Sequence, residues 1–102
     1  RLPLLVQRKK MPFLPAGEVV ARNYLRVTAL DVPGVMAQIA NVLSRHGISL
    51  AGINQHESKA GQSVPIVIMT HEAKEGDVEK ALAEIDALKS ITARTVRLRV
   101  LG

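Results

Sequence analysis

The chain has 102 residues, the size of one ordinary domain, which is too short for a large enzyme fold with a regulatory module beside it. Its hydrophobic content of 47% and charged content of 23% are globular values and argue against disorder. The absence of cysteine excludes disulfides, thiolate metal sites and a cysteine nucleophile. No apolar run reaches the roughly 18 residues of a membrane span, and the first residues lack the pattern of a signal peptide, so we expect no membrane partner and a cytoplasmic location.

The net charge of +5 is concentrated in the first part of the chain. Residues 1–22 carry five bases and one acid, a balance of +4, whereas the rest carries nine bases and eight acids, a balance of +1. Pro3, Pro12 and Pro15 interrupt any helical or strand period there. We therefore interpret residues 1–22 as a linker and residues 23–102 as the compact domain. The basic run RKK at 8–10 is interpreted as a solvated segment rather than a polyanion-binding patch.

The predicted elements begin with a strand over 23–30, where Leu25, Val27 and Ala29 alternate with other residues. The turn DVPGV follows at 31–35. Apolar residues then recur at helical spacing from 35 to 46, and Gly47 is a suitable helix end. A second strand over 48–57 changes its alternation at Gly52, which indicates a β-bulge.

The second half of the chain repeats this pattern. After a polar turn at 58–63, residues 64–71 are apolar at nearly every position and predict a third strand. Acids at 75 and 77 mark the start of a helix whose apolar face continues to Leu88. In the last strand, 95–101, three apolar residues alternate with Arg97 and Arg99.

The order of these elements predicts an α+β fold, the ferredoxin-like βαββαβ sandwich. Its four-stranded antiparallel sheet has the order 4-1-3-2 and carries two helices on one face. The third strand is apolar on both faces, so we expect something to cover part of the open face. The second strand is a long sheet edge without proline. We therefore predict a homodimer that pairs through the second-strand edge and extends the sheet.

Nucleic-acid binding, which the same fold can perform, has little support in the residues. RNA-binding modules of this shape stack bases on aromatic side chains of the central strands, and the only aromatic residues here are Phe13 and Tyr24. Arg26, Arg97 and Arg99 are predicted to share the open face of the sheet, where we interpret them as a solvated or partner-facing basic patch. No nucleic-acid partner is therefore expected.

Metal binding and catalysis are also disfavoured. His46, His56 and His71 do not form a ligand-spaced cluster, and His46 is better interpreted as capping a helix end. Acids at 72, 75 and 77 are interpreted as helix-start charges rather than a catalytic cluster. No nucleophile, base and orienting group can be placed in one cleft, and no nucleotide-binding motif is present. The chain itself is therefore expected to have no catalytic residue, metal or cofactor.

The turn at 31–35 is the strongest candidate for binding. A helix start gathers unpaired N–H groups, so those of Val32, Gly34 and Val35 could hold the carboxylate of a small amino acid. Oxygen atoms of Asp31, Asn54 and Gln55 could accept from its ammonium group. The alternative is that Asp31 only caps the helix and that the strand amides only bond along an edge. The residues alone favour neither interpretation.

Three segments carry a resemblance to a known family. They are YLRVTALDVPGV at 24–35, VPIVIMTHEA at 64–73 and ALAEID at 81–86. With HGIS at 46–49, they resemble an ACT domain, and specifically the C-terminal ACT domain of bacterial homoserine dehydrogenases. The resemblance covers residues 23–101, and residues 1–22 match the linker that follows the catalytic domain in that family.

The resemblance implies a regulatory fragment. The whole enzyme would reduce aspartate 4-semialdehyde to homoserine with NADPH or NADH, bound by a catalytic domain that these residues do not contain. Threonine would inhibit it by binding here, at a dimer interface between the first turn and the second strand of a partner. The alternative is a structural dimerisation domain without an effector. Carried over by position, the binding residues are Asp31, Val32, Pro33, Gly34, Val35, Ile53, Asn54 and Gln55.

Overall fold

The structure is a computed structural model that describes residues 15–55 and 61–100. The elements in chain order are the 3-10 helix η1 (Ala16–Glu18), β1 (Val20–Leu30), α2 (Val35–Arg45), β2 (Leu50–Gln55), β3 (Ser63–Thr70), β4 (Ala73–Lys74), α3 (Glu75–Asp86) and β5 (Val96–Val100). The predicted βαββαβ order is confirmed, with η1 and the two-residue strand β4 as additions.

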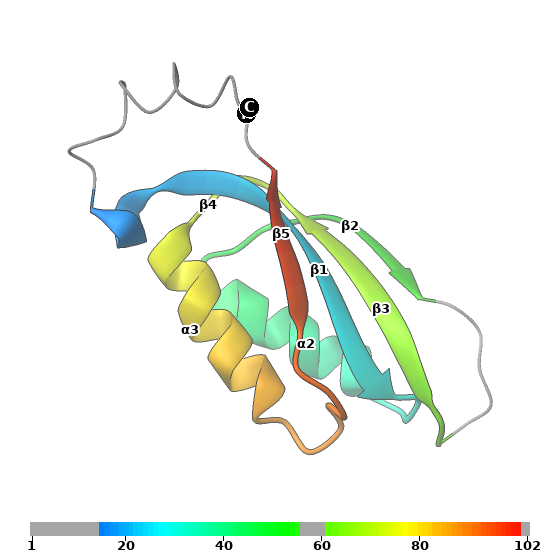
Figure 1. Cartoon of the computed structure of the whole chain (residues 1–102). Coiled ribbons are helices and arrows are strands. Elements are labelled where there is room, and N and C mark those ends of the chain that lie inside the picture. Colours follow the sequence, from blue (N-terminus) through cyan, green and yellow to red (C-terminus); the bar gives the residue numbers. More distant parts are fainter. Residues whose placement is uncertain (1–14, 56–60, 101–102) are drawn as a thin grey trace.

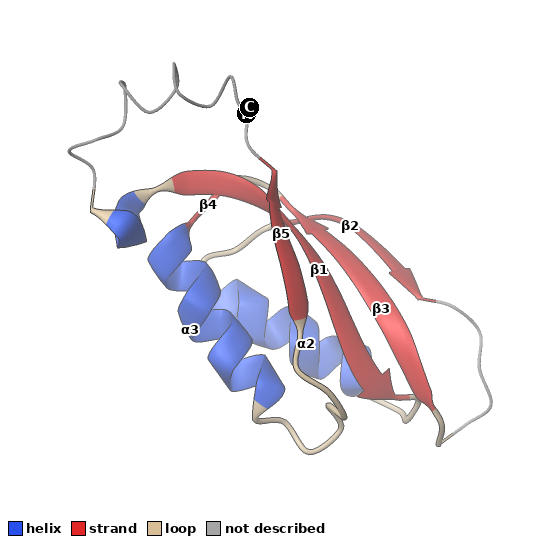
Figure 2. Ribbon diagram, in the orientation of Figure 1, coloured by secondary structure: helices blue, strands red, loops and turns tan. Residues whose placement is uncertain are grey.

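The sheet is antiparallel and places β1 at its centre. Strand β3 pairs with one edge of β1 and with β2, while β5 also pairs with β1, which confirms the predicted order 4-1-3-2. Strand β4 pairs with the beginning of β1, at Val20 and Ala21. Figure 1 shows both helices on the same side of the curved sheet, and Figure 2 shows the two layers by element type.

The core lies between the helices and one face of the sheet. In β1 the side chains of Leu25, Val27 and Ala29 are fully buried, as their alternation predicted, and Ile66 and Ile68 of β3 lie beside them. The helices contribute apolar residues at helical spacing, namely Val35, Ile39, Val42 and Leu43 from α2 and Val78, Ala81 and Ile85 from α3. Each large aliphatic side chain buried in this way contributes about 1.5–3 kcal/mol to folding.

Glycines define both ends of α2. Gly34 precedes the helix with a φ of 85°, a left-handed conformation that favours glycine. At the other end Gly47 has a φ of 73°, its N–H donates to Ser44 O at 2.9 Å, and Ile48 N–H donates to Leu43 O at 2.9 Å. This is a Schellman cap, and it confirms that Gly47 ends the helix.

Strand β2 begins at Leu50, two residues later than predicted, and has the expected irregularity. Its pairing with β3 shifts register between Leu50 and Gly52, which confirms the bulge. Residues 51–55 are all exposed. Among the described strands β2 pairs with β3 alone, so its other edge is open. The predicted strand end at His56 and Glu57 lies outside the described residues.

The chain meets the sheet earlier than Asn23, because β1 begins at Val20. The segment before it packs on the start of α3, where Glu75 N–H donates to Val19 O at 2.8 Å. A Cβ built on Gly76 would lie 3.4 Å from Gly17 O, so the two backbones are in contact. Residues 1–14, with the basic run at 8–10, lie outside the described residues. The division at residue 22 stays a prediction.

The prediction for the faces of the last strand was wrong. Arg97 pairs with Leu25 and Arg99 with Asn23, and both of these β1 residues face the helices. The apolar residues of β5 therefore lie on the open face, where Val96, Leu98 and Val100 are 57%, 61% and 44% exposed. The expectation assumed that apolar residues point inward, whereas the guanidinium groups are held on the helix side by a carboxylate described below. Arg26 remains on the open face without them.

Candidate functional site

The turn between β1 and α2 is held in place by the backbone. Asp31 N–H donates to Gln62 O at 2.8 Å and Asp31 O accepts from Gly61 N–H at 3.0 Å, which fixes the turn against the start of β3. Pro33 and Gly34 are exposed, while Val32 packs against the core. The turn is therefore rigidly anchored on one side and open to solvent on the other.

Of the three N–H groups predicted to be open in this turn, only that of Gly34 has no acceptor among the described residues. Val32 N–H donates to Leu30 O at 3.0 Å and Val35 N–H to Val32 O at 3.3 Å, so these two groups are used inside the turn. Within the part of the chain that the structure describes, the N–H groups of Gly34, Met36 and Ala37 have no acceptor. The first turn of α2 also has no acid. An anion at this helix start would therefore contact the N–H groups of Gly34, Met36 and Ala37. Unpaired N–H groups are expected at these positions, because the first N–H groups of a helix have no acceptor within it.

The three predicted residues of β2 do not converge on the turn of their own chain. Val27, Ile66 and Gln55 are in register across β1, β3 and β2, so β3 lies between the turn and β2. Asn54 pairs with Val67 on the open face. Ile53 and Gln55 pair with Ile68 and Ile66, which places both on the helix side. The polar pair thus points to opposite faces, and one copy alone does not assemble all eight predicted residues.

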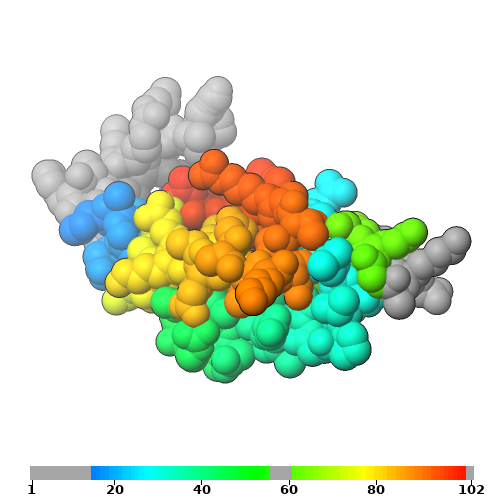
Figure 3. All heavy atoms as spheres, turned by 90° about the horizontal axis from the view of Figure 1, so that it is seen from below, coloured from blue at the N-terminus to red at the C-terminus, as the bar shows by residue number. Residues whose placement is uncertain are grey.

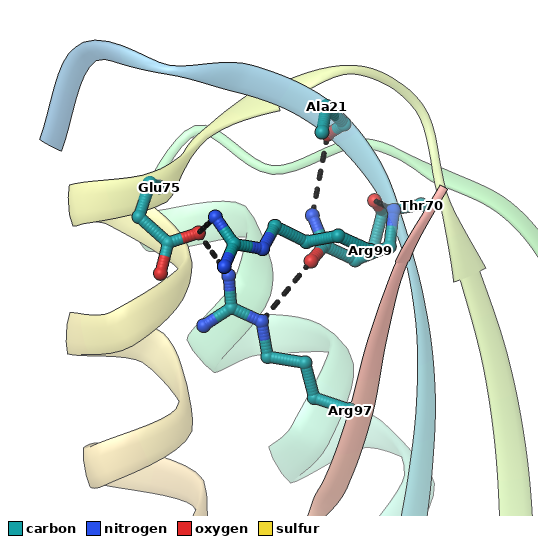
Figure 4. Close-up of polar contacts among 6 residues, drawn as sticks. Ala21, Thr70, Glu75, Arg97 and Arg99 are labelled. Carbon is teal, nitrogen blue, oxygen red and sulfur yellow. Dashed lines mark hydrogen bonds and ion pairs between the residues drawn. The ribbon is translucent and has the colours of Figure 1, made fainter. Parts of the chain in front are cut away.

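A buried polar network at the start of α3 was not predicted. Glu75 Oε1 forms an ion pair with Arg97 and lies 3.5 Å from Arg99 Nη1. The side chains of Glu75 and Arg97 are only 11% and 16% exposed. Figure 4 shows the two guanidinium groups converging on this carboxylate. Arg97 Nε also donates to the buried Asn23 Oδ1 at 3.2 Å, and Asn23 Nδ2 to Ala21 O at 3.2 Å. The network ties β5 to β1 and α3.

A second polar cluster joins the two helices. Glu84 of α3 accepts from His46 Nε2 at 2.7 Å and from Arg45 Nη2 at 2.5 Å. The hydrogen bond from His46, followed by that from Arg45, holds the pKa of Glu84 below its ordinary value. The imidazole of His46 therefore contacts a carboxylate on the other helix, whereas the sequence interpretation had it capping the carbonyls of its own helix.

Glu84→Gln tests this cluster by its pH dependence. Because the folded pKa is lowered, the stabilisation is present above the unfolded pKa and is lost as pH falls through the folded pKa. We expect the variant to unfold more easily than the parent at neutral pH and the difference to shrink below about pH 4. Denaturant melts across pH measure it. Glu79→Gln, on the same helix and without an ion pair among the described residues, should show no such trend.

Two surface hollows lie at the connection between α3 and β5, and none of their lining residues belongs to the turn at 31–35. One of about 440 Å³ is lined by Asp86, Ile91, Thr92, Ala93 and Arg94, and one of about 340 Å³ shares Asp86 and Arg94 with it. Asp86 Oδ1 already accepts from Thr95 N at 3.1 Å and from Thr95 Oγ1 at 2.6 Å. Figure 3 shows this connection, in orange, beside the yellow and orange surface of α3.

Residues 15–55 and 61–100 contain no group of three or more His, Asp or Glu side chains placed to hold a metal ion. In the same ranges, no helix has the length and hydropathy needed to cross a membrane.

The fold and the turn define a βαββαβ module of a known class. The family model for the ACT domain matches residues 23–90, and the chain belongs to that family. It is 37% identical over 91 residues to a homoserine dehydrogenase of Methylobacillus glycogenes and 38% identical over 90 residues to that of Pseudomonas aeruginosa. These alignments cover 88% and 87% of this chain but only 22% and 21% of the relatives.

A solved structure is also similar to this chain. The homoserine dehydrogenase of Thiobacillus denitrificans superposes with a TM-score of 0.75 and 35% identity, covering 84% of this chain and 19% of that one. The chain thus spans about a fifth of the length of the homoserine dehydrogenases that it matches.

Proposed function

We propose that the chain is the regulatory domain of a homoserine dehydrogenase and that it binds threonine as a feedback inhibitor. The observation that carries the proposal is the start of α2, where Gly34, Met36 and Ala37 present N–H groups without an acceptor among the described residues. Such groups favour the carboxylate of an amino acid. The choice of threonine rests on the similarity to the homoserine dehydrogenases.

The proposed site is shared between two copies. The open edge of β2 allows a second β2 to pair with it, which extends the sheet across the dimer. The turn of one copy then supplies the N–H groups, and β2 of its partner supplies Ile53, Asn54 and Gln55. Because β3 separates the two halves within one chain, this arrangement is the one in which they could meet.

The proposed regulation acts on a catalytic domain in the rest of the longer polypeptide, which would reduce aspartate 4-semialdehyde with NADPH or NADH. Threonine can lower that activity only by its different affinity for two dimer arrangements. The segment directly before β1 packs on the start of α3, where Glu18 forms an ion pair with Lys74 at 3.3 Å. A change in the dimer would pass to the preceding domain through this contact.

A calorimetric titration of the 102-residue chain with threonine tests the proposal. We expect saturable heat with threonine and less with isoleucine, methionine and serine, together with a larger dimer fraction in sedimentation velocity. The absence of both heat and any change in melting temperature at millimolar threonine would contradict the proposal.

A purely structural dimerisation domain is the second candidate. It is favoured by the use of the Val32 and Val35 N–H groups inside the turn, because this leaves fewer donors for a ligand. A dimer that is equally stable with and without threonine would support it.

A further inference from the structure

The open face of the sheet is apolar where an exposed face is normally polar. In an antiparallel sheet with one face in water, polar residues usually occupy that face. Strand β5 reverses this rule, since Val96, Leu98 and Val100 point outward and remain 57%, 61% and 44% exposed. Its arginines point inward to Glu75. Exposure to water does not account for this arrangement, so the face needs a partner.

The apolar area continues across the sheet in two rows. Met69, Tyr24 and Leu98 are in register on β3, β1 and β5. Val67, Arg26 and Val96 form the next row. We name as the open-face patch the residues Tyr24, Val67, Met69, Val96, Leu98 and Val100. Both helices lie on the other side of the sheet, and no described element covers the patch (Figure 2).

Arg26 lies inside the patch and determines the chemistry of its partner. It is exposed, it is flanked by Val67 and Val96, and it has no ion pair or hydrogen bond of its side chain among the described residues. A purely apolar partner would bury this guanidinium without compensation, which is costly. A partner with a carboxylate at this point could bind it in a bidentate manner.

The same face of a second copy does not have this chemistry. The open face of the described strands carries Arg22 and Arg26 but neither Asp nor Glu. Two such faces packed together would bring arginines close to one another without a counter-charge. The partner must therefore be a different surface.

We infer that the open-face patch docks on an apolar surface bearing a carboxylate, located in the preceding part of the longer polypeptide. The assignment to that polypeptide rests on the proposed function. The alignments cover only 22% and 21% of these relatives, so the relatives contain further domains. The chain reaches the sheet at Val20, beside Arg22, whose pairing partner Val100 ends the patch. A preceding domain is therefore tethered at one end of the patch.

Cysteine labelling tests the inference, because this chain has no cysteine of its own. Leu98→Cys is placed in the 102-residue chain and in the full-length protein, and site-resolved maleimide labelling rates are measured by mass spectrometry without threonine. We expect labelling to be slower in the full-length protein by about tenfold or more, since a covered thiol reacts only when the interface opens. Ser44→Cys, exposed on α2, should label at the same rate in both.

Charge variants then test the partner. In the full-length protein, Arg26→Glu should return the labelling rate of Leu98→Cys toward that of the isolated chain, whereas Arg26→Lys should keep most of the protection. Equal rates in both proteins would overturn the docking. Protection in the isolated chain that rises with its concentration would identify a second copy and overturn the stated occupant. Protection unaffected by Arg26→Glu would overturn the carboxylate.

The outcome is separate from that of the threonine titration. A chain that gives no heat with threonine but is protected at Leu98→Cys keeps the docking and loses the effector. If the chain binds threonine but Leu98→Cys is labelled at the same rate in the isolated chain and in the full-length protein, the effector is kept and the docking is lost.

Discussion

Replacing Glu75 by alanine is expected to lower the free energy of unfolding by about 3 kcal/mol, the lower end of the range for breaking a buried ion pair. The substitution leaves Arg97, which is 16% exposed, without its carboxylate, and Arg99 loses the same oxygen. Both guanidinium groups point to the helix side of β5. Because a domain of this size has a total stability of about 5–15 kcal/mol, the loss is large. Urea denaturation measures it.

Glu72→Ala is the matched control, since Glu72 is exposed and has no partner among the described residues. The double variant Glu75→Gln with Arg97→Met should recover part of the loss, because the largely buried Arg97 charge is removed together with its carboxylate, while the remaining Arg99 side chain is 49% exposed. If Glu75→Ala costs no more than Glu72→Ala, the network does not stabilise the fold.

Gly34→Asp is expected to weaken threonine binding by about a hundredfold or more, the equivalent of losing two charge-assisted hydrogen bonds. The new carboxylate would lie at the start of α2, where it takes the place of the ligand's carboxylate and repels it. Calorimetric titration of the variant with threonine measures the loss.

Gly34→Asn is the control for backbone strain. Asparagine tolerates the left-handed conformation at φ 85° as aspartate does, and it has nearly the same size but no charge. Both variants should therefore lose similar stability, while the asparagine variant binds threonine more tightly than the aspartate variant. Equal affinities in the two variants would remove the charge argument and with it the proposed carboxylate site.

The sequence predicts the elements and their order better than it predicts which way side chains face. Alternation in residues 95–101 separates the valines and leucine from the arginines correctly, but it does not say which set faces the helices. That depends on Glu75, a residue 22 positions away in sequence from Arg97, whose carboxylate lies where the arginines can reach it. Pairing between such distant residues has no local signal in a single sequence.

The sequence also predicts the turn of the candidate site but not which of its N–H groups are open. The pattern at 31–35 predicts a turn before a helix, and both are present. Which N–H groups stay open depends on hydrogen bonds inside the turn, where Val32 and Val35 find acceptors, whereas Met36 and Ala37 find none in residues 15–55 and 61–100. The position of β2 relative to the turn depends on β3 lying between them, so the pairing of the site's two halves stays a prediction.

The central place of β1 also determines how the domain bears load. Strand β1 is bonded on one side to β3 and on the other to β5, so a force along its axis would act on both ladders. The ladder bonds are perpendicular to the strands, so they resist such a force in shear, all together, rather than opening one at a time. The first contacts to be stretched are those of Glu18 and Val19 with the start of α3. A force along β1 would therefore be shared by both ladders before either neighbouring strand separates from it.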